Sequence, residues 1–140
     1  METRKNTILV PIGDLSNDLT VIQKAAEMAR NTGNTLHFLH VKEVDNIRTG
    51  GYGYMEMIVL EDWKEDELSN LLKEKAKGVV TEIEIVPHAD IVDCIVERAK
   101  NYEMIIIGHH HTGLIEEFFI NSTSEKVINR VDSDVFIVHT

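Results

Sequence analysis

Five short apolar runs alternate along this chain with four longer segments in which apolar residues recur at helical spacing. The runs are rich in isoleucine, valine and leucine and are too short for helices, so they predict β-strands. They are Thr7–Ile12, Thr35–Val41, Val79–Val86, Met104–Ile107 and Val135–Val138. The helical segments cover residues 17–32, 55–77, 91–101 and 122–130. Regular alternation of strand and helix predicts an α/β fold, with a parallel sheet, right-handed crossovers and helices on both faces.

Three strands have patterns that predict their place in the sheet. Val79–Val86 includes alternating apolar and polar residues, which predicts a strand exposed on one face and near an edge. Met104–Ile107 is the most apolar run, and we expect it to be the central strand. The segment Val135–His139 is apolar and comes last in the order. Because an apolar edge strand invites pairing with a second copy, this segment predicts a homodimer interface.

Composition narrows the classes of partner and compartment. The 140 residues fit one domain, covering 1–140, with a substantial hydrophobic core. A formal net charge of −10 disfavours nucleic acid and anionic membranes as partners. The N-terminal residues lack a signal-peptide pattern, and no apolar run approaches the roughly 20 residues of a membrane span. The single cysteine, Cys94, excludes an intramolecular disulfide, so we expect a reducing, cytoplasmic location.

The loop after the fourth predicted strand carries the main functional signal. Gly108 ends the strand and opens the loop Gly108–Gly113, which precedes the capping-box pattern Ser122–Glu125 of the fourth helix. A buried strand that ends in glycine and leads to a helix N-terminus is where α/β proteins hold phosphates. Here three histidines, His109–His111, fill the span where glycines are expected. The loop therefore has the position of a nucleotide-binding loop but lacks the glycines expected of one.

The polar residues of this loop each have a structural interpretation beside a functional one. A helix N-terminus such as that at Ser122 is compatible with anion binding, but the role of Ser122 as the N-cap of the fourth helix explains it without any ligand. The run His109–His111 offers imidazoles to Zn²⁺ or Ni²⁺, together with His37, His40 or His88. Consecutive residues of one loop rarely aim at a single ion, so we expect no metal site.

No pattern in the chain predicts catalysis. Cys94 lies on the apolar face of a predicted helix, where a lone cysteine is usually a small core residue. A nucleophile elbow and paired carboxylates are absent from the sequence, so we expect a protein that is not an enzyme. The glycine-rich segment 50–54 is a ligand lid, a partner-docking loop or a plain connection between elements.

The chain resembles the universal stress protein family over essentially its whole length. Ile8–Pro11 is similar to the family's opening strand, and Gly108 and Ser122 stand in the register of its G-x2-G-x9-G-[ST] signature. The segments Ile105–His110 and Asp134–Val138 are similar to the universal stress protein A branch. The resemblance implies an adenine nucleotide α-hydrolase-like fold with strand order 3-2-1-4-5, and dimerisation through the last strand. A ligand crevice is then expected at the carboxyl ends of strands one and four, where the order reverses.

The departures from the family pattern concern the phosphate loop. In register, His111 and Asn121 replace the second and third signature glycines. Gly13 stands where nucleotide-binding members carry an acidic residue after the first strand, and Asp14 is displaced by one position. A histidine brings a bulky ring and rarely adopts φ > 0, whereas asparagine does so more easily. Both replacements therefore disfavour a triphosphate in the loop. The resemblance to the A branch, whose members are taken not to bind ATP, also argues against ATP binding.

These features predict a degenerate nucleotide site in a cytoplasmic stress-response regulatory protein. Its candidate residues are Pro11, Gly13, Asp14, Gly108, His109, His111, Gly113, Asn121 and Ser122. We expect no cofactor, and we expect action as a homodimer with protein partners. The alternative is a nucleotide sensor of the same family that binds ATP or AMP through the remodelled loop.

The double substitution His111→Gly and Asn121→Gly tests the loop argument. It restores both signature glycines, so we expect it to create or strengthen ATP binding, measured as a rise in the melting temperature with ATP and Mg²⁺. If ATP does not raise the melting temperature of the double variant, the lack of ATP binding is instead caused by the change at Gly13 and Asp14.

Overall fold

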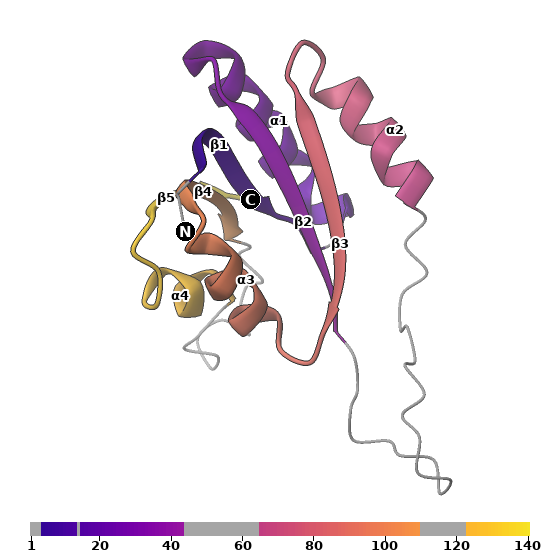
Figure 1. The fold of residues 1–140 in the computed structure, drawn as a ribbon. Coiled ribbons are helices and arrows are strands. Elements are labelled where there is room, and N and C mark those ends of the chain that lie inside the picture. The colour runs from indigo at the N-terminus through magenta and orange to yellow at the C-terminus, as the bar shows by residue number, and fades with distance from the viewer. Residues whose placement is uncertain (1–3, 14, 44–64, 110–122) are drawn as a thin grey trace, which may run out of the picture.

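The computed structural model describes residues 4–13, 15–43, 65–109 and 123–140. These residues form a five-stranded sheet in the order β3-β2-β1-β4-β5, and every pair of neighbours is parallel (Figure 1). The strands are β1 (Arg4–Pro11), β2 (Thr35–Glu43), β3 (Thr81–His88), β4 (Tyr102–His109) and β5 (Asp134–His139). The α/β class and the strand order expected from the sequence are confirmed.

The helices lie on both faces of the sheet, as predicted. They are α1 (Leu15–Thr32), α2 (Glu65–Lys75), α3 (Ile91–Ala99) and α4 (Thr123–Ile128). One core joins α1 and α2 to one face, and a second core joins α3 and α4 to the other (Figure 1). Alternate residues of β1 supply the two cores, because successive side chains of a strand point to opposite faces.

The position of the central strand differs from the expectation. β1 is the middle strand, and β4, which contains Met104–Ile107, is its interior neighbour. Ile105, Ile106 and Ile107 are buried, as any strand covered on both faces requires. An apolar run therefore distinguishes interior strands from edge strands, but not the middle strand from the one beside it. β3 and β5 are the two edges, as expected.

The ends of the helices follow local chemistry that the sequence shows. Gly33 has φ +72° just after α1, where a residue with a Cβ atom would be strained. Asp90 is the N-cap of α3, and its carboxylate accepts a hydrogen bond from the backbone N–H of Asp93 at 3.0 Å. The predicted start of the second helix, residues 55–64, and the glycine-rich segment 50–54 lie outside the described residues.

Candidate functional site

A cavity of about 200 Å³ lies where the strand order reverses, between the carboxyl ends of β1 and β4. This is the expected position of a ligand crevice in an open parallel sheet. Its lining residues come from β1 and the following turn, α1, β2, α3, β4 and α4: Pro11, Ile12, Gly13, Asp18, Leu39, Val41, Ile91, Ile95, Ile107, Gly108, Thr123 and Ser124. A larger groove, about 470 Å³, lies away from this edge, near the amino ends of β4 and β5.

Four of the predicted site residues are placed at this edge of the sheet. Pro11, Gly13 and Gly108 line the cavity, and His109 follows Gly108 at the end of β4. The sequence therefore correctly brought together the ends of the first and fourth strands. The remaining candidates lie outside the described residues: Asp14, His111, Gly113, Asn121 and Ser122. The interpretation of Ser122 as the N-cap of α4 stays a prediction.

The acidic group of the site is Asp18, which sequence reasoning missed. Asp18 lies in the first turn of α1 and is only 3% exposed. Its carboxylate accepts a hydrogen bond from the backbone N–H of Gly13 at 2.6 Å, directly after β1. The sequence does contain a signal for this placement: Asp18 precedes Ile22, Ala25 and Ala29 at helical spacing, so it shares the buried face of α1.

The contact between Gly13 and Asp18 places a carboxylate at the cavity wall. A backbone N–H at the end of β1 is the kind of donor that a phosphate oxygen accepts from in related folds. Here a carboxylate of the same chain accepts from it, and the helix dipole of α1 favours a negative charge in the first turn. The cavity wall consequently includes a buried carboxyl group beside mostly apolar side chains.

The opposite wall is held by a histidine–serine contact that sequence reasoning also missed. The Nδ1 atom of His109 lies 2.9 Å from the hydroxyl oxygen of Ser124, a buried residue of α4. The ring of His109 also packs edge-on against that of His139, with 5.7 Å between the ring centroids. The backbone N–H of Thr140 donates to the carbonyl of His109 at 3.0 Å. These contacts tie the end of β4 to both α4 and the end of β5.

The two histidines of β2 point to opposite faces of the sheet, as their spacing predicted. His40 is buried, and its Nδ1 lies 2.9 Å from the carbonyl oxygen of Ile12. Since a carbonyl only accepts, Nδ1 carries the proton, and the ring supports the turn that follows β1. His37, on the other face, contacts Tyr102. Among the residues that the structure describes, no group of three or more His, Cys, Asp or Glu side chains is arranged to hold a metal ion.

Cys94 is buried in the core between the sheet and α3, as the sequence indicated. Burial raises the pKa of the Cys94 thiol, although the guanidinium of Arg98 acts in the opposite direction. A thiol whose pKa is raised is a poor nucleophile at neutral pH. Cys94 is therefore a core residue and not a reactive group of the cavity.

The described residues thus define a class: a single-domain α/β protein with a doubly wound parallel sheet and a cavity at the reversal of strand order. The profile of the Universal stress protein family matches residues 5–139, and the chain belongs to this family. The resemblance noted from Ile8–Pro11, Gly108 and Ser122 is confirmed. No helix within the described ranges is long and apolar enough to cross a membrane.

Individual relatives are distant in sequence but similar over the whole chain. The chain is 26% identical over 142 residues to Universal stress protein A homolog 2 of Coxiella burnetii, with 99% of this chain and 97% of that protein covered. A solved universal stress protein from Archaeoglobus fulgidus DSM 4304 gives a TM-score of 0.69 at 22% identity, over 96% of this chain and 44% of that chain. This chain therefore spans less than half of that longer chain.

A second solved structure, a universal stress protein in complex with cAMP, gives a TM-score of 0.67 at 21% identity. The match covers 95% of both chains. At such identities these similarities to solved structures show the fold alone.

Substituting Ser124→Ala tests whether the contact with His109 stabilises this edge of the sheet. The variant loses a buried hydroxyl that lies 2.9 Å from Nδ1 of His109, so we expect the free energy of unfolding to fall by about 1 kcal/mol in urea denaturation. The control is Thr123→Ala, which removes an exposed hydroxyl from the preceding residue and should change stability by less than about 0.5 kcal/mol. Equal stability of the two variants would mean that the contact contributes nothing.

Proposed function

We propose that this chain is a non-enzymatic stress-response regulatory protein that acts as a cytoplasmic homodimer through protein partners, with a degenerate nucleotide pocket. The observation that carries this proposal is the hydrogen bond from the N–H of Gly13 to the buried carboxylate of Asp18. A backbone donor at the cavity is thus taken up by a carboxylate of the chain itself, and this carboxylate disfavours a ligand phosphate beside it.

The size of the cavity and the chemistry of the loop support the same proposal. The described residues enclose about 200 Å³, whereas small-molecule sites typically measure roughly 300–1,000 Å³. In the sequence, His111 and Asn121 replace two glycines of the family signature. The formal net charge of −10 adds a general repulsion of polyanions. Each of these features disfavours a triphosphate in particular.

The alternative is a nucleotide sensor that binds AMP or ATP. It is favoured by one specific observation: a solved relative with the same fold over 95% of this chain is in complex with cAMP. The apolar side chains Leu39, Val41 and Ile107 line the cavity and offer surfaces against which a nucleotide base can pack. The two proposals differ in whether the phosphate end of such a ligand is tolerated beside Asp18.

A thermal-shift experiment separates the two. A ligand at 100 times its Kd adds about 2.7 kcal/mol to the free energy of unfolding. We expect no rise in the melting temperature of the wild type with millimolar ATP, AMP or cAMP and Mg²⁺. A clear rise in the wild type would overturn the degenerate-pocket proposal in favour of the sensor.

The variant Asp18→Asn sharpens that experiment. It removes the buried negative charge but keeps an oxygen that accepts from Gly13, so we expect AMP to raise its melting temperature where it does not raise that of the wild type. The control is Asp90→Asn, the same chemical change at the exposed N-cap of α3. A ligand response that is equal in all three proteins would show that Asp18 does not exclude phosphates.

The homodimer proposal rests on β5, an edge strand. Phe136 is 42% exposed and Ile137 is 36% exposed, on opposite faces of that strand. Phe136 also borders a small groove with Lys24 and Met28 of α1. Two copies of β5 can pair through their free edges about a two-fold axis, which covers these side chains and satisfies the edge backbone groups. Val135–His139 is the interface that the sequence analysis put forward.

Placing a charge in this strand tests the dimer. We expect Ile137→Asp to elute as a monomer in size-exclusion chromatography with light scattering, because pairing would bury the carboxylate. The control, Val80→Asp, places the same charge at an exposed position just before β3, at the other side of the sheet, and should leave the dimer intact. A dimer that survives Ile137→Asp would exclude β5 as the interface.

A further inference from the structure

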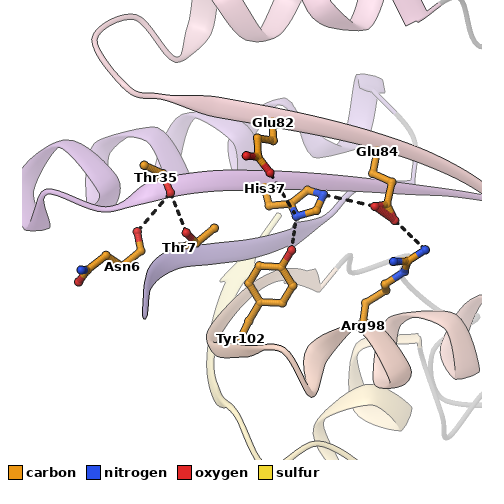
Figure 2. Close-up of polar contacts among 8 residues, drawn as sticks. All are labelled: Asn6, Thr7, Thr35, His37, Glu82, Glu84, Arg98 and Tyr102. Atoms are coloured by element: carbon orange, nitrogen blue, oxygen red, sulfur yellow. Dashed lines mark hydrogen bonds and ion pairs between the residues drawn. The ribbon is translucent and has the colours of Figure 1, made fainter. Parts of the chain in front are cut away.

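A buried histidine lies on the sheet face that α3 covers. His37 of β2 is 7% exposed and has polar partners on both ring nitrogens (Figure 2). Its Nδ1 atom contacts the hydroxyl of Tyr102, at the start of β4, and lies 4.0 Å from a carboxylate oxygen of Glu82. Its Nε2 atom lies 3.8 Å from a carboxylate oxygen of Glu84. Both glutamates are on β3, where Glu82 is directly in register with His37.

One of these carboxylates is shared with a helix. The other oxygen of Glu84 lies 2.9 Å from the guanidinium of Arg98 on α3 (Figure 2). The described contacts of His37 therefore bring together two carboxylates and one guanidinium, which sum to one negative charge while His37 is neutral. Protonation of His37 cancels that charge.

Three further described groups lie close to the ring or to its carboxylates, and each of them is uncharged. Its neighbour in register on β1 is Leu9, an apolar residue. On α3, Cys94 is close enough to Arg98 and Glu84 to interact with them, and burial raises the pKa of its thiol, which keeps it neutral. Tyr102 of β4 contributes a neutral hydroxyl.

We propose that His37 is a proton-operated clamp, which binds a proton more tightly in the folded chain than in the unfolded chain and then holds β3 and α3 to the sheet. In the neutral state the Tyr102 hydroxyl donates to Nδ1, and the Nε2–H faces Glu84. In the protonated state the Nδ1–H donates to the same hydroxyl oxygen, and the positive ring faces Glu82 and Glu84.

Burial of the ring opposes its charging, and the carboxylates favour it. The carboxylates prevail because they approach both nitrogens and because water reaches Glu82, which is 63% exposed, so its own desolvation is small. The clamp thus stabilises the folded chain at pH values below the range in which histidine side chains titrate. This added stability is lost as the pH rises through that range. Mild acidification tightens the attachment of the edge strand β3 and of α3.

The clamp is connected to the cavity through α3. α3 supplies Ile91 and Ile95 to the cavity wall, and Arg98 lies about one turn further along the same helix. Holding Arg98 through Glu84 therefore holds the helix that forms one wall of the cavity. The clamp does not depend on which ligand, if any, the cavity takes.

Urea unfolding of the wild type and of His37→Gln between pH 8 and pH 5.5 tests the clamp. Subtracting the variant from the wild type at each pH removes the contribution of every other titrating group. We expect the unfolding constant of the wild type to fall relative to that of the variant by about threefold or more on acidification; a single proton sets a limit of about tenfold per pH unit. A ratio that is independent of pH, or that changes in the opposite direction, overturns the proposal.

The matched control is His88→Gln. The Nδ1 atom of His88 accepts the backbone N–H of Asp90 at 2.9 Å, and among the described residues no carboxylate lies within ion-pair distance of its ring. The unfolding constant of this variant, divided by that of the wild type, should not increase in the same way on acidification. An equal increase in both variants would assign the effect to histidine content rather than to the clamp, and would overturn the proposal.

A titration of the folded wild type by NMR of its labelled imidazoles needs no substitution at His37 and decides the question even if His37→Gln fails to fold. We expect the His37 ring to take up its proton within the range from pH 8 to 5.5. In Glu82→Gln, which changes an exposed side chain, uptake should move to lower pH. A ring that stays neutral to pH 5.5, or that titrates alike in both proteins, overturns the clamp.

Discussion

The strand β1 is paired on both edges and covered on both faces, and the site and the clamp are both organised around it. Ile8, Leu9 and Val10 are buried almost completely, which contributes about 2 kcal/mol of transfer free energy for each side chain. Ile8 and Val10 belong to the core under α1 and α2, while Leu9 belongs to the core under α3. Because β2 and β4 flank β1, the chain crosses from one side of it to the other, and the cavity lies where that crossing leaves the carboxyl ends open.

The described polar contacts at this edge are made between groups of the chain itself. Asp18 accepts from Gly13, His40 donates to Ile12, and the hydroxyl of Ser124 pairs with His109. Buried polar groups need partners, and in a nucleotide-binding protein a phosphate supplies some of them. Here groups of the chain itself supply these contacts. The described part of this edge is therefore held together by hydrogen bonds within the chain.

Much of the fold could be predicted from the sequence, because the pattern of apolar residues reports burial directly. The apolar run Ile105–Ile107 indicated an interior strand, the alternation in Val79–Val86 indicated an edge, and Asp90 indicated a helix start. The strand order came from the resemblance to the family, since the alternation of elements does not determine which strands are neighbours. The same limitation explains why β4 was expected in the centre, where β1 lies.

The candidate site could be predicted only in part, because its contacts depend on how helices rotate against the sheet. The loop motif indicated Gly108, which lines the cavity, and His109, which follows it at the end of β4. It could not show that Ser124 would be the residue that faces His109, because that depends on the rotation of α4 about its axis. Asp18 required knowledge of how the first turn of α1 approaches Gly13. His37 required the register of β2 against β3, which places Glu82 directly beside it.

α3 connects the two polar features of the molecule. One part of it carries Ile91 and Ile95 in the cavity wall, and the other carries Arg98, which binds Glu84 beside His37. If proton uptake by His37 changes how firmly α3 is held, then any molecule that binds better to one state of the wall must, by linkage, change the proton affinity of His37 by the same factor. In this way α3 would couple the proton on His37 to the wall of the cavity, because both are attached to the same helix.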